Sequence, residues 1–432
     1  MVADKTLKSK VFFVSQPQVK ESVRLRISWF LPFLPALLLA PNLALAGLEM
    51  NEIRALARKH SASLKAKEME ARALEHDLSF KGKWSNPQLL GQIGSLRSGG
   101  AQGSTLELTL TQAVPLTNKH SLKRELAEKA LEGQQQQQDF FRNWVEHQAL
   151  LSAWKARIQL ALFAHGIERA ERIRLIERYL ATQPRVSVRQ RVELSVVSSV
   201  VLRLLRQQDQ KKFELTRAED DLSYWLGRKV SAQEIVGGIP PEAKIRIPPE
   251  GSHTRDPEWQ QANLQLESSR IEATLASRER WPDLVLGGGY RVERVAPINQ
   301  FTYALIGLTL PLWDTGFSRR DSADARVRRA EFELEDTERR IRLKHEKLLE
   351  QARFELQQVK RFPTSLIQVQ ERAILEAERG FKQRLLDVGT FLQAETETHE
   401  VLDQIYLSWQ NYLESLSPLL LMSGEPLIWE QP

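Results

Sequence analysis

The residue types that carry catalysis do not gather into a recognisable set in this sequence. None of the eight histidines has a second histidine four positions away, the spacing that places two metal ligands on one helix face. Glu397, His399 and Glu400 lie close together but lack that second histidine. His345 falls on an apolar helix face, where a packing histidine is the usual case. The sequence therefore predicts no enzyme active site, no metal site and no cofactor.

Glycine and cysteine usage exclude two other kinds of site. Gly287, Gly288 and Gly289 fall inside a predicted strand and no Lys-Ser or Lys-Thr pair follows, so they are not a phosphate-binding loop. Within a strand, glycine allows a close approach or a kink. The chain has no cysteine, which excludes a disulfide framework, a thiolate metal site and a lipid-bearing N-terminal cysteine.

One order of strand and helix patterns occurs twice along the chain, which predicts an internal two-fold repeat. Each copy has a helix, a β-hairpin, a long helix, a short tip and a return helix. The opening helices are predicted at 48–78 and 257–280, and Pro363 is expected to kink or break the long helix of the second copy. The predicted segments are a signal peptide (1–46), a first repeat (47–227), a linker (228–257), a second repeat (258–422) and a C-terminal tail (423–432). The first repeat contains the hairpin 84–115 and the long helices 117–180 and 190–225. The second repeat contains the hairpin 282–312 and the long helices 315–378 and 390–416.

The N-terminal segment has the composition of an export signal. A basic region ends at Arg26, an apolar run covers residues 27–40, and Ala44-Leu45-Ala46 supplies small residues for a signal peptidase. A membrane anchor is the alternative interpretation of this segment. The first 26 residues hold six of the basic side chains against two acidic ones, so the net charge of +6 does not indicate a nucleic-acid partner.

Side chains alternate along the predicted strands, with apolar residues on one face and polar residues on the other. A membrane barrel with a wet interior needs this pattern, but a half-buried soluble sandwich has it too. Trp84, Trp281 and Trp313 fall at strand ends, where an aromatic girdle would lie. On the barrel interpretation the lipid-facing residues are Leu106, Leu108, Leu110, Leu284, Leu286 and Tyr290, and the lumen residues are Glu107, Thr109, Thr111 and Arg291.

Four strands in two hairpins cannot close a barrel alone, and an open sheet edge is not tolerated in lipid. The sequence therefore predicts that several copies of the chain complete one sheet. The long helical patterns carry a narrow apolar face flanked by Arg, Glu and Lys, which favours helix-on-helix packing of the coiled-coil kind. The predicted fold class is an α+β membrane protein with a long α-helical coiled-coil barrel and a shared β-barrel.

At this point the chain resembles the TolC-like outer-membrane efflux proteins of Gram-negative bacteria. The resemblance is carried by NPQLL and LTLTQAVPL in the first repeat, WPDLVLGGGYR and LIGLTLPLWD in the second, and LLDVGTFLQAET before the last helix, and it covers residues 48–422. It implies a homotrimer with a 12-stranded barrel in the outer membrane and an α-helical tunnel across the periplasm. It also implies docking to a periplasmic adaptor (a membrane fusion protein) and an inner-membrane pump of the RND type, with no chemistry in this subunit. The cysteine-free N-terminus and short barrel loops are similar to the heavy-metal (CzcC-like) branch, whose cargo is metal cations.

The resemblance also points to the tips of the long helices. In a trimer an inward-facing acid forms a ring of three, which attracts cations or holds an aperture closed by pairing with Arg or Lys. Asp387 and then Glu395 are the candidate aperture residues, with a helix cap or a solvated charge as the alternative for each. The candidate contacts of the tips with the adaptor are Arg185, Arg189, Arg191 and Arg384.

Two other functions fit parts of the pattern. A periplasmic coiled-coil adaptor or scaffold protein also has long helices, but it usually surrounds a single helical hairpin with small β domains. An outer-membrane component of type I protein secretion uses the same kind of tunnel with a protein as cargo. Cell fractionation separates the adaptor from a channel, because only the channel is expected in the outer membrane.

Overall fold

The computed structural model describes residues 47–98, 101–182, 187–237, 256–294, 298–309, 316–425 and 427. The chain divides into two units, Met1–Leu45 and Ala46–Pro432, and the described residues all belong to the second. The predicted signal peptide, Arg185, Trp313 and most of the predicted linker and tail lie outside the described residues.

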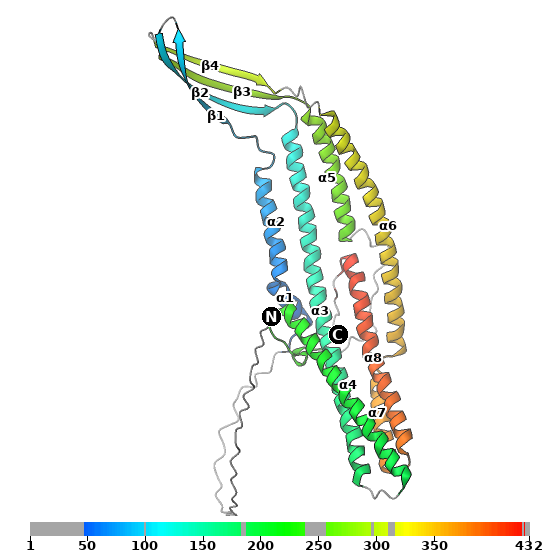
Figure 1. Ribbon diagram of the computed structural model, residues 1–432. Helices are drawn as coiled ribbons and strands as arrows, with labels where there is room; N and C mark the ends of the chain where they lie inside the picture. Colours follow the sequence, from blue (N-terminus) through cyan, green and yellow to red (C-terminus); the bar gives the residue numbers. More distant parts are fainter. Residues whose placement is uncertain are drawn as a thin grey trace, which may run out of the picture. The chain divides into compact units, whose positions relative to one another are not determined.

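Four strands form one antiparallel sheet in the order β1-β2-β3-β4 (Figure 1). They are β1 Gln88–Ser98, β2 Ala101–Pro115, β3 Asp283–Arg294 and β4 Asn299–Leu308. The prediction of four strands per chain in two hairpins is confirmed. The pairing of β2 with β3 joins the two hairpins into a single sheet, which the hairpin patterns alone did not specify.

Helices make up most of the remaining described chain. They are α1 Met50–His60, α2 Ala62–Phe80, α3 Lys119–Thr182, α4 Val188–Leu226, α5 Pro257–Glu279, α6 Phe317–Arg361, α7 Leu366–Lys382 and α8 Val388–Ser423, with a short 3₁₀ turn at Ala232–Glu234. Local sequence signals mark their ends. Ser187 and Gln190 form a capping box at the start of α4, and Gly227 ends that helix with φ 67°. No described helix is long and apolar enough to cross a lipid bilayer.

The structure differs from the predicted helices at both ends of the described unit. The helix expected at 48–78 is two helices, because Ser61 leaves the helical conformation and accepts a hydrogen bond from Leu64 N to cap α2. The last helix, expected to end at 416, continues to Ser423 with Pro418 inside it and ends where Gly424 has φ 67°. Between α6 and α7 the break falls at residues 362–365, where Pro363 interrupts the pattern.

The described part of the predicted linker is packed rather than extended. Val230, Ala232 and Ile235 are buried, and Leu48 forms a parallel bridge with Ile235. Leu48 N donates to Glu234 O at 2.7 Å, so the segment before α1 is tied to the 3₁₀ turn that follows α4. The apolar residues that produce this packing stand between Gly227 and a Gly- and Pro-rich stretch. The composition of the whole segment therefore predicted an irregular linker, although its first residues are packed.

The helices pack side by side in a fixed order (Figure 1). Nearest the sheet, α2 contacts α3, α3 contacts α5 and α5 contacts α6; farther along, α3 packs with α4 and α8, and α7 packs with α8. A large apolar cluster around Trp409 and Tyr412 joins α1, α3, α4, α6 and α8. A second cluster around Phe391 and Ile173 joins α3, α4, α7 and α8 near the tips of the long helices. Burial of these apolar side chains fixes the positions of the tips.

Candidate functional site

The register of the sheet sorts the predicted strand residues onto two faces. Leu106 lies opposite Val292 and Leu108 lies opposite Tyr290. One face carries all six residues predicted to meet lipid (Leu106, Leu108, Leu110, Leu284, Leu286 and Tyr290), and the other carries the four predicted lumen residues (Glu107, Thr109, Thr111 and Arg291). Ile93 on β1 and Ile306 on β4 extend the apolar face and are 84% and 77% exposed. The apolar face is therefore uncovered across all four strands.

The polar face contains a hydrogen-bonded cluster centred on Tyr303, which sequence reasoning missed. The Tyr303 hydroxyl lies 2.6 Å from Thr109 Oγ1 and donates a short hydrogen bond to Glu107. Arg291 pairs with Glu293 at 2.9 Å on the same face. Gly289 makes the cluster possible, because a Cβ there would lie 2.3 Å from the Tyr303 ring. The polar face is thus internally bonded and carries both signs of charge.

At the tips the structure brings together residues of α4 and α8. Asp387 is the N-cap of α8, with its Oδ1 accepting from Thr390 N at 2.7 Å. The bonds from Thr390, with a smaller contribution from the nearby Arg189 guanidinium, hold the pKa of Asp387 below its usual value. Arg189 at the start of α4 also bonds Glu193 at 2.7 Å, which raises the pKa of Arg189. The tip therefore presents an exposed, ionised carboxylate beside an exposed guanidinium.

The other two described tip arginines are also exposed. Arg191 is exposed in the first turn of α4. Arg384 is exposed between α7 and α8 and has φ 61°, the left-handed conformation that favours glycine.

The structure places Glu395 differently from the sequence prediction. Glu395 is 1% exposed between α8 and α3, so it does not face an opening. Arg169 Nε donates to one oxygen of Glu395 at 3.1 Å, and His399 Nε2 lies 3.1 Å from the other. The sequence held the signal, because Glu395 stands in the buried series of Phe391, His399 and Leu402 at spacings of three and four. The helical periodicity of α8 therefore places Glu395 on the buried face of the helix.

Two adjacent residues of α3 form a second buried polar centre that sequence reasoning missed. Glu146 is 3% exposed and pairs with Arg54 at 2.7 Å and with Arg58, both from α1. Burial acts to raise the pKa of Glu146, but the bonds from the two arginines outweigh it and the pKa is lowered. His147 is 1% exposed, with Nδ1 3.2 Å from Ser417 Oγ and Nε2 3.0 Å from both Glu425 O and Leu427 N. This centre ties α1 and the end of the chain to α3.

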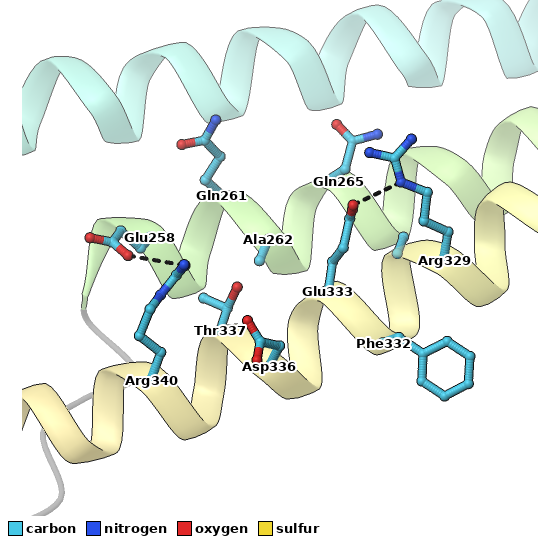
Figure 2. A pocket seen from close by; sticks show the side chains of 11 residues that line it. Glu258, Gln261, Ala262, Gln265, Arg329, Phe332, Glu333, Asp336, Thr337 and Arg340 are labelled. Atoms are coloured by element: carbon cyan, nitrogen blue, oxygen red, sulfur yellow. Dashed lines mark hydrogen bonds and ion pairs between the residues drawn. The ribbon is translucent and has the colours of Figure 1, made fainter.

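A groove of about 800 Å³ lies between α5 and α6, and Figure 2 shows Arg340 reaching Glu258 and Arg329 reaching Glu333 along it. Four of its charged side chains are held in ion pairs, Arg340 with Glu258 at 3.4 Å and Arg329 with Glu333 at 2.8 Å. Among the described residues no group of three or more His, Cys, Asp or Glu is placed to hold a metal ion.

These features define a class of protein by fold: a mostly helical chain with a four-stranded sheet, as in the TolC-like outer-membrane efflux channels. No protein-family model matches the sequence, and no curated protein matches it. Solved structures do match. The open-state MtrE outer membrane channel of Neisseria gonorrhoeae aligns with a TM-score of 0.72 and 14% identity over 88% of this chain and 89% of that one. The CmeC outer membrane channel of Campylobacter jejuni aligns with a TM-score of 0.67 and 13% identity over 87% of this chain and 85% of that one. The TolC-like fold expected from the sequence is confirmed.

Proposed function

We propose that this protein is the outer-membrane channel subunit of a tripartite efflux system. The observation that carries the proposal is the sheet, which has an uncovered apolar face, a polar face and, in the described chain, one unpaired edge at β1 and another at β4. In lipid each unsatisfied backbone group costs several kcal/mol. Further copies of the chain complete the sheet, and three copies give a barrel of 12 strands with Glu107, Thr109 and Arg291 inside.

The proposed assembly is a homotrimer in the outer membrane of a Gram-negative bacterium, with its helices extending into the periplasm. The fold shared with the MtrE and CmeC outer membrane channels supports this location. The helix tips with Arg189, Arg191 and Arg384 are the surface that meets a periplasmic adaptor, which connects the channel to an inner-membrane pump of the RND type. Three exposed arginines suit an adaptor surface rich in carboxylates.

The subunit acts as a passive conduit for small solutes, and metal cations are the proposed cargo. Asp387 from each of three chains places three carboxylates at the tips, which raises the local concentration of cations. Deletion of the gene is expected to sensitise cells to divalent metals more than to lipophilic drugs. Equal metal resistance with and without the gene would remove the metal assignment and leave the channel assignment intact.

The channel assignment itself is tested by fractionation and by conductance. The protein is expected in the outer-membrane fraction, to run as a trimer in mild detergent, and to produce discrete ion conductance in a planar lipid bilayer. A protein that is monomeric and stays in solution without detergent would overturn the proposal, because the apolar sheet face requires lipid.

A further inference from the structure

A glycine of β3 lets a side chain of β4 reach across to β2 on the polar face of the sheet. In the strand register Gly289 lies between Thr109 of β2 and Tyr303 of β4. Strands β2 and β4 are two strand spacings apart, roughly 9.5 Å. The Tyr303 side chain crosses this distance over Gly289, which has no Cβ to obstruct it, and its hydroxyl reaches Thr109 and Glu107. Tyr303 therefore bonds to a strand that is not its neighbour.

Two hydroxyl groups hold the Glu107 carboxylate in place. Tyr303 donates a hydrogen bond to Glu107 Oε1, and Thr109 Oγ1 lies 3.5 Å from the same oxygen. Thr109 Oγ1 also lies 2.6 Å from the Tyr303 oxygen, which can accept a proton while its own proton is on Glu107. All three side chains are half-buried. Because hydroxyl groups are neutral donors, they fix the position of the carboxylate without cancelling its charge.

The cation nearest to Glu107 in the strand register is paired with a different acid. Glu107 and Arg291 lie directly opposite each other in the pairing of β2 with β3, on the same face of the sheet. Side chains in such positions are close enough for opposite charges to pair. Arg291 instead pairs with Glu293 at 2.9 Å, two positions along its own strand. The bond from Tyr303 therefore competes with the pairing of Glu107 and Arg291.

Glu107 also differs from the other acids on the polar face of the four described strands. The charged side chains of this face are Glu107, Asp283, Arg291 and Glu293. Asp283 pairs with Lys119 at 2.8 Å, and Glu293 pairs with Arg291. Glu107 is bonded by hydroxyl groups. Each chain therefore contributes to this face one carboxylate whose charge is not compensated by a partner within the described strands.

We infer that Glu107 selects cations inside the barrel and that Tyr303 is the residue that positions it. Three chains related by rotation place three Glu107 carboxylates at one level of the lumen, where they attract cations and repel anions. Without the Tyr303 hydroxyl, the Glu107 carboxylate turns to Arg291 and the two charges cancel. The inference rests on the proposed function, which supplies the closed barrel. It adds a selectivity element within the sheet, apart from Asp387 at the helix tips.

Reversal potentials of single open channels in planar lipid bilayers test both parts of the inference. They are measured in a potassium chloride gradient at low ionic strength, where screening is weakest. Glu107→Gln is expected to lower the potassium-to-chloride permeability ratio by at least about twofold. Tyr303→Phe keeps the ring over Gly289 but removes the hydroxyl, and it is expected to lower the ratio as well. Asp387 is unchanged in every variant, so its contribution to the ratio is constant.

Three further variants separate positioning of Glu107 from a general effect on the sheet. If Tyr303 acts by keeping Glu107 away from Arg291, the effect of Tyr303→Phe disappears when Arg291 is absent. Tyr303→Phe/Arg291→Gln is therefore expected to have the same ratio as Arg291→Gln alone. Gly289→Ala keeps the tyrosine, but its Cβ collides with the Tyr303 hydroxyl and is expected to reproduce the effect of Tyr303→Phe. The matched control is Tyr290→Phe, the same chemical change on the apolar face of β3, which is expected to keep the wild-type ratio.

The possible failures are distinguishable. A wild-type ratio in Glu107→Gln would show that Glu107 does not select ions. A wild-type ratio in Tyr303→Phe, or an equal loss with and without Arg291, would show that Tyr303 does not position Glu107 against Arg291. Wild-type protein that forms neither trimers nor conducting channels would overturn the proposed function, and this inference with it.

Discussion

Lys119 in the first turn of α3 and Asp283 at the start of β3 form an ion pair of 2.8 Å that joins the two hairpin regions where helices meet strands. Lys119 is 8% exposed, and its Nζ also donates to Trp281 O at 2.7 Å. Lys119→Met is expected to destabilise the protein by about 1–3 kcal/mol, because it leaves a carbonyl and a carboxylate without their charged donor. The loss is measured from thermal unfolding of the detergent-solubilised protein.

The matched control for that variant is Arg124→Met. Arg124 makes an exposed pair with Glu128 at 2.9 Å within one helix. Pairs of this kind contribute about 0.3–0.5 kcal/mol, so Arg124→Met should be close to wild type. If the two variants were equally stable, the Lys119 pair would contribute no more to stability than an exposed pair within one helix.

The buried ion pair of Arg169 on α3 and Glu395 on α8 predicts that substitutions of these two residues have coupled effects on stability. Arg169→Met leaves the Glu395 carboxylate buried without its guanidinium partner, with His399 Nε2 still 3.1 Å away, and is expected to cost about 3–5 kcal/mol of unfolding free energy. The double variant Arg169→Met/Glu395→Leu removes both charges and is expected to be more stable than Arg169→Met alone. A double-mutant cycle measured by denaturant unfolding gives the coupling. Losses that simply add would show that the two side chains do not depend on each other.

From the burial of His147 we predict that the folded protein loses stability in mild acid. Burial is the main cause that lowers the pKa of His147 to about 4, and the nearby Glu146 and Arg54 act in opposite directions on it. Above pH 6.5 the imidazole is neutral in both the folded and the unfolded state, so it adds no pH dependence. As the pH falls from 6.5 to about 4 the unfolded chain binds a proton that the folded chain does not. The unfolding free energy therefore falls across this window, by about 3 kcal/mol in total.

The variant His147→Gln isolates this contribution. Gln does not titrate, so the difference in unfolding free energy between wild type and His147→Gln is expected to shrink as the pH falls from 6.5 to 4. The exposed His76→Gln serves as the control and should follow the wild-type curve. A wild-type curve parallel to that of His147→Gln throughout the window would refute the assignment.

The sequence predicted much of this fold because the strand and helix patterns are local. Alternation along β2 and β3 assigned the faces of the sheet, and Pro363 marked the break between α6 and α7. Pairing of β2 with β3 and the position of Tyr303 over Gly289 are contacts between distant segments, for which one sequence holds no local signal. Ser61 was missed because a polar residue inside a helical pattern reads as an exposed position until its capping bond is seen.

The candidate site was less predictable, because charge type does not reveal burial. Glu395 and Asp387 are both acidic residues near the start of α8, yet Glu395 lies on the buried side of the helix and Asp387 is its N-cap. The helical periodicity of α8 distinguishes the buried Glu395 from the exposed Asp387, whereas the carboxylate that both carry does not. The pairing of Glu146 with Arg54 and Arg58 depends on how α1 packs on α3, which no pattern in either helix specifies.

Asp387 has two roles that substitution separates, since it caps α8 and carries a charge at the tip. Asn caps helices about as well as Asp, so Asp387→Asn should keep the start of α8 while removing the charge. In planar bilayers Asp387→Asn is expected to lower the potassium-to-chloride permeability ratio by at least about twofold, since three carboxylates would be lost from the tips of a trimer. Arg189→Gln removes the neighbouring positive charge and is expected to change the ratio in the opposite direction.

Ionic strength provides the control for this electrostatic effect. In about 1 M salt the screening length is near 3 Å, so the difference between wild type and Asp387→Asn should largely disappear. Asp387→Ala removes both the charge and the cap; it should match Asp387→Asn in selectivity but loosen the first turn of α8, detectable as faster amide exchange at Thr390. If Asp387→Asn and Arg189→Gln both left the permeability ratio unchanged at low salt, Asp387 would be a helix cap without a part in conduction.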